Sequence, residues 1–141
     1  MAASFTGEGT VAPLVRTIRS RHDTDAAAGT DYGEVIGAAP FDGVVSGVRF
    51  LPDAAVSGAT TTATTWTVAN KTKTLNAAAL AFITATDLVA FTAKTITNSG
   101  TAANLVCAAG DVYALVKTHA STGTAMPSGS IEIDFSANSI L

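Results

Sequence analysis

The chain has 141 residues, of which only 13% are charged, and its net charge at neutral pH is −3. Soluble domains usually carry about 25% charged residues, so this composition favours a protein that works packed within an assembly. The mild acidity, with no basic cluster interleaved with aromatic residues, argues against nucleic acid as a partner. No run of about eighteen apolar residues indicates a membrane span, and the length is that of one domain.

Catalytic and metal-binding patterns are missing from the sequence. No nucleotide-binding glycine loop, His-Glu-x-x-His motif, Gly-x-Ser-x-Gly elbow or EF-hand spacing occurs. The two histidines, His22 and His119, are too few for a histidine-based site. The single cysteine, Cys107, excludes an internal disulfide, and its apolar neighbours predict a buried side chain rather than a reactive thiol. We expect no enzyme, no catalytic residue, no metal and no cofactor.

The first residues lack the basic start and the apolar stretch of a secretory signal. We therefore expect the protein to be made in a cytoplasm and to work there or in something assembled there.

Residues 1–33 are rich in Gly, Ala, Thr and Asp and show little alternation, which is typical of an N-terminal arm. Apolar residues within the arm recur at the spacing of one helical face, after Thr10 as a candidate N-cap, and predict one or two turns of amphipathic helix. Three arginines share this stretch and could pair with acidic residues of a partner, with a solvated basic face as an equal alternative. We expect the arm to contact a neighbouring subunit or a shell rather than fold back on its own domain. The candidate binding residues are Val11, Leu14, Val15, Arg16, Ile18, Arg19 and Arg21.

The β pattern begins after this arm. Residues 34–38 predict a weak strand, and residues 41–52 predict a strong one with Val44, Val48 and Phe50 on one face. Two glycines within the stronger strand indicate a bend or a β-bulge.

The middle of the chain combines one clear strand with two ambiguous segments. Residues 66–70 predict a strand with Trp66 facing inward, followed by a polar turn. Residues 75–85 favour either a strand or a partly helical segment, and residues 86–91 favour one capped helical turn. Alternation resumes at residues 92–97.

Two stretches near the C-terminus, 112–117 and 130–136, alternate in character and predict strands. Two antiparallel strands with one apolar face cannot stand alone, so the earlier segments must supply the rest of the sheet and its cover. The residues that share one face of the first strand are Tyr113, Leu115 and Lys117, and those predicted to face the core in the second are Ile131, Ile133 and Phe135.

Several carboxylates have a structural interpretation. Asp111 follows a glycine in a turn, and we expect its carboxylate to accept hydrogen bonds from nearby backbone N–H groups. Glu132 and Asp134 share the outward face of one strand. Together with Asp42 and Asp53 they are candidates for a surface cation site, but solvated carboxylates are the expected outcome.

About eight short strands separated by turns predict an all-β fold, an antiparallel β-sandwich with jelly-roll-like character. In this interpretation residues 34–141 form the sandwich and residues 1–33 form the extended arm.

Three passages resemble the β-sandwich head decoration, or cement, proteins of tailed bacteriophages, over about residues 33–136. They are Pro40–Val45 leading into Phe50–Ala55, the Trp66–Lys71 strand that ends in Val-Ala-Asn-Lys, and Ala108–Val112 continuing through His119 to Ile131–Phe135. The resemblance implies a virion protein on the outside of an expanded icosahedral head, commonly a homotrimer. It also implies that the partner is the major capsid protein, whose subunit contacts the protein reinforces.

The alternative is a carbohydrate- or receptor-binding sandwich from a phage tail fibre or tip. Such a module usually needs exposed aromatic rings, and Trp66, Tyr113 and Tyr32 are the only large amphipathic rings in the chain. Trp66 is predicted to be a core residue. This alternative would therefore be favoured only if Trp66 and Tyr113 were exposed together on one open face.

Overall fold

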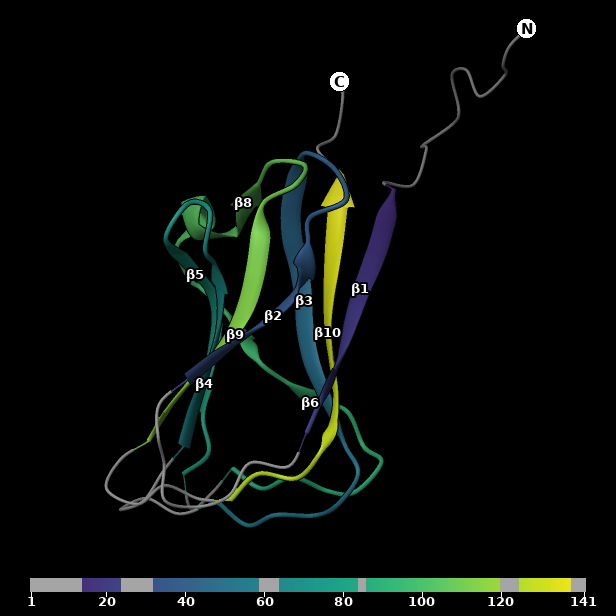
Figure 1. Ribbon diagram of the computed structural model, residues 1–141, viewed down its shortest axis with the longest axis vertical. Coiled ribbons are helices and arrows are strands. Elements are labelled where there is room, and N and C mark those ends of the chain that lie inside the picture. The colour runs from purple at the N-terminus through teal and green to yellow at the C-terminus, as the bar shows by residue number, and fades with distance from the viewer. Residues whose placement is uncertain (1–13, 24–31, 59–63, 84–85, 120–124, 138–141) are drawn as a thin grey trace, which may run out of the picture.

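The computed structural model describes residues 14–23, 32–58, 64–83, 86–119 and 125–137, which form an antiparallel β-sandwich (Figure 1). The predicted all-β sandwich is confirmed, with ten described strands where about eight were expected. The strands are β1 (Val15–His22), β2 (Tyr32–Ala38), β3 (Gly43–Pro52), β4 (Thr64–Asn70), β5 (Leu75–Ala81), β6 (Lys94–Thr95), β7 (Thr97–Asn98), β8 (Val106–Cys107), β9 (Val112–His119) and β10 (Gly129–Ala137), with a short 3-10 helix, η1, at Ala102–Leu105.

The strands form two sheets that face each other. The sheet that we call the β10 sheet has the order β1-β10-β3-β6, with β8 also paired to β3, and the β9 sheet has the order β2-β9-β4-β5-β7. Only β4 and β5 are consecutive strands that pair with each other, across a polar turn at residues 71–74. Every other connection between consecutive strands passes from one sheet to the other. The two layers are therefore interwoven, and neither can be completed without the other.

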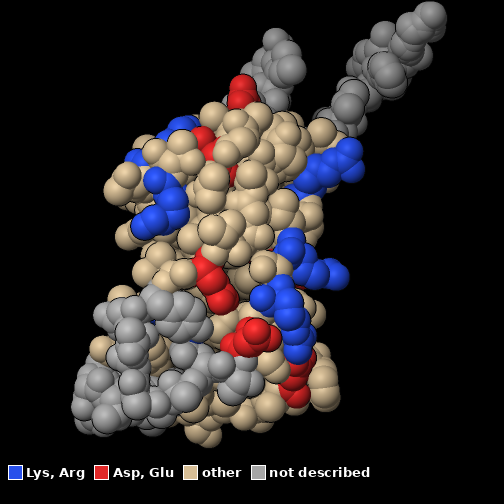
Figure 2. All heavy atoms as spheres, viewed as in Figure 1, with Lys and Arg blue, Asp and Glu red and all other residues tan. Residues whose placement is uncertain are grey.

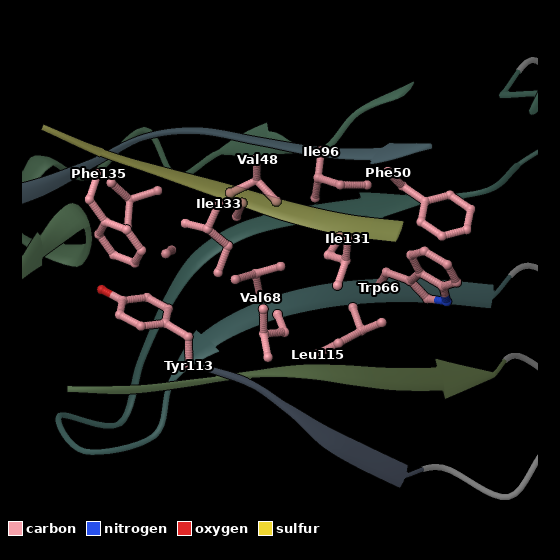
Figure 3. Packing of buried hydrophobic residues seen from close by; sticks show 14 of the residues in the cluster. Val48, Phe50, Trp66, Val68, Ile96, Tyr113, Leu115, Ile131, Ile133 and Phe135 are labelled. Atoms are coloured by element: carbon pink, nitrogen blue, oxygen red, sulfur yellow. The ribbon is translucent and has the colours of Figure 1, made fainter. Parts of the chain in front are cut away.

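The core fills the space between the sheets and is aromatic at both ends (Figure 3). Trp66 packs edge-to-face on Phe50 at one end, with ring centroids 4.6 Å apart, and Tyr113 packs on Phe135 at the other, at 5.2 Å. Aliphatic side chains lie between these pairs, as Figure 3 shows for Val68. The inward faces predicted for residues 66–70 and 130–136 are confirmed, and Tyr113, Leu115 and Lys117 do share one face, on the core side of β9.

The helix predicted in the N-terminal arm is wrong over its described part. Val15–His22 is a strand that pairs along its whole length with β10, from Val15 opposite Ser136 to His22 opposite Gly129. This segment therefore folds back on its own domain and completes the β10 sheet. The apolar residues have helical spacing, but pairing with β10 decides the structure of the segment. β10 is paired with β3 on one side, and the backbone hydrogen-bonding groups on its other side can be satisfied by a strand.

The bulge predicted in β3 is confirmed, but it changes which valine faces the core. Gly47 pairs with Asp134 and Val45 with Phe135, so Ser46 is the extra residue. An extra residue inverts the alternation of side chains. Val45, which is 1% exposed, consequently lies inside, and the predicted core residue Val44 is only partly buried.

The two ambiguous segments in the middle of the chain both lack helix in their described residues. Leu75–Ala81 is strand β5, paired with β4. In the segment predicted as a helical turn, Leu88 instead forms an isolated bridge with Val56, and the Phe91 N–H donates to the Pro52 carbonyl. Phe91 adopts a positive φ of 58°, which closes a loop and is incompatible with a helix. The predicted capped helical turn is therefore wrong.

Pairing of β1 with β10 predicts that deletion of residues 1–22 destabilises the whole sandwich. The deletion removes the strand that covers the β10 edge, and with it a buried ring that packs on Trp66. We expect a loss of at least about 3 kcal/mol of unfolding free energy, measured by urea denaturation followed through Trp66 fluorescence.

A matched deletion of residues 1–13 keeps all of β1 and serves as the control. We expect its urea midpoint to stay close to that of the full chain. Equal midpoints for the two deletions would show that β1 does not contribute to the folded core.

Candidate interaction surfaces

The outward face of the β10 sheet is held by ion pairs between neighbouring strands. Glu132 in β10 lies between Arg19 of β1 and Arg49 of β3, which are its register neighbours on either side. It is ion-paired to Arg19, and the Arg49 Nε lies 2.6 Å from its Oε1. These contacts leave the Glu132 side chain only 3% exposed. The expectation of a solvated carboxylate at Glu132 is therefore wrong.

Asp134 is bound by the same pair of strands. The Arg49 Nη1 lies 2.6 Å from its Oδ2, and the Thr17 hydroxyl donates to its Oδ1 over 2.5 Å. The hydrogen bond from Arg49 lowers the pKa of Asp134. Further along β1, Arg21 is ion-paired to Asp53, which directly follows β3. The hydrogen bond from Arg21 lowers the pKa of Asp53. Three of the four carboxylates considered for a cation site, Glu132, Asp134 and Asp53, are thus paired with arginines.

Asp42, the fourth of those carboxylates, accepts a hydrogen bond of 2.8 Å from the Ala109 N–H. It therefore stabilises the turn before β9 and does not join the carboxylates of β10. Among the described residues no group of three or more His, Cys, Asp or Glu side chains is arranged to hold a metal ion.

β1 lies at the end of its sheet and contains most of the candidate binding residues. No strand of the described chain pairs with its outer edge. Leu14 and Val15 are half-exposed, and Arg16 is exposed and has no ion pair within the described residues. Figure 2 shows basic side chains along the side of the molecule on which β1 lies. The predicted residue Val11 lies outside the described residues.

The seven candidate residues do not form one uniform site. Ile18 is partly buried against the core cluster, so it contributes to the fold. Arg19 and Arg21 are engaged with Glu132 and Asp53. What remains available for a partner is the N-terminal end of the strand, Leu14, Val15 and Arg16.

His22, at the other end of β1, links the two edge strands. Its buried ring lies edge-to-face on Trp66 and on Phe50, with centroids 4.9 Å and 6.0 Å away. Its Nδ1 lies 2.7 Å from the Oε1 of Glu34 in β2. Sequence reasoning treated His22 only as a residue too isolated for a metal site. The signal in the sequence is the strand spacing of His22 from the apolar Ile18, which puts both on the inward face if the segment is a strand.

The turn before β9 is built around Asp111, as predicted. Its Oδ2 accepts hydrogen bonds from the Ala108 N–H at 3.0 Å and from the Asn70 amide at 2.8 Å. The Ala108 N–H lowers the pKa of Asp111. Gly110, in the same turn, has a φ of 88°, which favours glycine. Asp111 immediately precedes β9 and His119 ends it, so the two lie at opposite ends of the strand and cannot form a dyad.

Burial also explains the chemistry of the side chains near this turn. It raises the pKa of Tyr113 to about 12 and raises the pKa of the Cys107 thiol. Cys107 is buried and free, as predicted, and its thiol lies 3.6 Å from the Phe41 carbonyl oxygen. Both groups are neutral at physiological pH and pack in the hydrophobic core.

A shallow groove of about 340 Å³ lies beside the bulge of β3. Its lining includes Ser46, Arg49, Thr95 and Asn98. The guanidinium of Arg49 is already bound by Glu132 and Asp134. The groove therefore presents hydroxyl and amide groups without a free charge.

No family model, curated protein or solved structure matches the chain. In the part of the chain that the structure describes, no helix is long and apolar enough to cross a membrane. The inference of function therefore depends on the surfaces described above.

The position of Glu132 predicts a measurable cost for removing one of its partners. In Arg49→Met, a carboxylate that is almost fully buried keeps only Arg19, and Asp134 loses its guanidinium contact. We expect the unfolding free energy to fall by about 2 kcal/mol, because a buried charge that loses its partner is costly and Arg49 is partly solvated. Chemical denaturation of Arg16→Met is the control and should show a change below about 0.5 kcal/mol. Similar losses in the two variants would contradict the assignment.

The lowered pKa values of Asp111 and Asp134 predict acid sensitivity. Each carboxylate titrates below its ordinary value of 3.8 in the folded protein, so its stabilisation is complete above that value and is lost as the pH falls through the folded pKa. We expect the urea midpoint to change little from neutral pH to about pH 5 and to fall steeply below about pH 4. The fall should be shallower in Asp134→Asn, and a slope equal to that of the unaltered protein would exclude Asp134 as a source.

Proposed function

We propose that this protein binds the outside of a tailed-phage capsid and reinforces contacts between major capsid protein subunits. The resemblance of its sequence to head decoration proteins motivates the proposal. The structural observation that carries it is the outer edge of β1, where Leu14, Val15 and Arg16 are presented by a strand anchored along its length to β10.

An edge strand of this kind suits attachment to a preformed surface. Its outer N–H and C=O groups can pair with an extended segment of another protein, and its side chains add an apolar contact and one cation. A decoration protein does not need a deep pocket, because many copies bind one lattice and modest contacts add up. The ion pairs behind β1 hold the strand in place and leave Arg16 as its available charge.

The carbohydrate- or receptor-binding alternative has no comparable observation in its favour. Trp66 and Tyr113 are both fully buried between the sheets, as Figure 3 shows, so neither ring offers a face on which a sugar could stack. The shallow groove beside β3 is not lined by an aromatic residue.

Binding to heads assembled without this chain tests the proposal. The purified protein should co-sediment with such heads, and Arg16→Glu should weaken binding about tenfold at low salt, because it reverses the available charge of the β1 edge. Lys71→Glu makes the same change of net charge at an exposed turn on the other sheet and should bind within about twofold of the unaltered protein.

Failure of the unaltered protein to co-sediment with heads would overturn the proposed function. Equal weakening by Arg16→Glu and Lys71→Glu would instead show that net charge, and not the β1 edge, governs attachment.

A further inference from the structure

The outward face of the β9 sheet carries no charged residue. Strand alternation places Val35, Ala114 and Ala69 in one row across β2, β9 and β4. A second row runs through Val116, Thr67 and Ala79 on β9, β4 and β5. Every other residue on this face of the sheet is also Gly, Ala, Val, Thr or Asn. The charged residues of these strands, Glu34 and Lys117, lie on the opposite, core side.

The outward face of the β10 sheet, in contrast, carries charged residues. It carries Arg19, Arg49, Glu132 and Asp134, and it is held together by their ion pairs. The two outward faces of the sandwich therefore differ, since one carries ion pairs between its strands and the other carries no charged residue. A uniformly uncharged second face is a specific feature of the fold.

This uncharged face is accessible and shallow. Val35 on the edge strand β2 is 66% exposed, whereas Ala69 and Ala114 near the middle are 5% and 6% exposed. The side chains are short across the whole face, so another sheet can pack closely on it.

We propose that this face packs against the same face of a second copy of the chain to form a two-fold dimer. Four strands of seven or eight residues, spaced about 4.8 Å apart, cover roughly 450–500 Å² per molecule. Two such faces bury about 1,000 Å² together, which is the lower end for a specific interface.

A second copy is the partner that fits the chemistry of the face. A two-fold axis brings the same face of both copies together, so a face with a net charge would meet the same net charge on its copy, and this face carries none. Self-pairing of β1, an open edge of the β10 sheet, would bring Arg16, Arg19 and Arg21 towards the arginines of the copy. The outward face of the β9 sheet is thus a surface on which copies can associate without like-charge repulsion.

This inference goes beyond the proposed function and differs from the trimer that the family resemblance implies, because a face-to-face pair closes with two copies. It is tested on the purified full chain without capsids, so its outcome is independent of particle binding. Sedimentation velocity over a range of concentrations should show a monomer–dimer equilibrium with a dissociation constant of roughly 10 µM.

Val35→Lys and Ala79→Lys place a lysine at opposite sides of the face, on exposed positions of β2 and β5. Each should weaken dimerisation about tenfold or more, because both copies bring the added charge to the interface. Ala103→Lys adds the same charge at an exposed position of η1 and should dimerise like the unaltered protein. Circular dichroism and urea midpoints unchanged from those of the unaltered protein establish that each variant is folded.

The following results would overturn the inference. They are a monomer at concentrations of about 100 µM, a trimer, or a dimer that both folded face variants retain. Loss of dimerisation in the Ala103→Lys control as well would equally contradict a role for this particular face.

Discussion

The pairing of β1 with β10 is the interaction on which the rest of the structure depends. Without β1, β10 would have an open edge, and Glu132 would lose one of its two arginines. The same strand brings His22 into the core against Trp66 and Phe50 and connects it to Glu34 in the opposite sheet. One strand near the N-terminus therefore satisfies backbone groups, supplies counter-charges and joins the two layers, and its remaining edge is open to a partner.

The placement of charge follows from this arrangement. Arginines from β1 and β3 flank the carboxylates of β10, so the outward face of that sheet is internally neutralised. The other sheet has no outward charges and relies on small and β-branched side chains. The two sides of the sandwich thus differ in chemistry, and we infer that they serve different contacts. An edge with a cation suits attachment to another protein, and an uncharged face suits association between copies.

Local pattern was enough to predict the all-β fold, the core of β10 and the turn at Asp111, because alternation and turn chemistry are encoded by neighbours in sequence. It was not enough for β1, where the spacing of Val15 and Ile18 fits one face of a helix, and only the otherwise unpaired edge of β10 makes the segment a strand. The burial of Glu132 was also beyond local pattern. Arg19 and Arg49 are far from it in sequence, and only the strand register brings all three together. The bulge was predicted, but its position, which exchanges Val44 for Val45, depends on pairing with Phe135.

Immunogold electron microscopy of intact virions, with an antibody raised against this chain, tests the central claim most directly. The account predicts gold distributed over the surface of the heads, since the protein is proposed to bind the exterior of the capsid. Gold confined to tail tips, or absent from virions, would contradict it, even if the purified sandwich were folded as described.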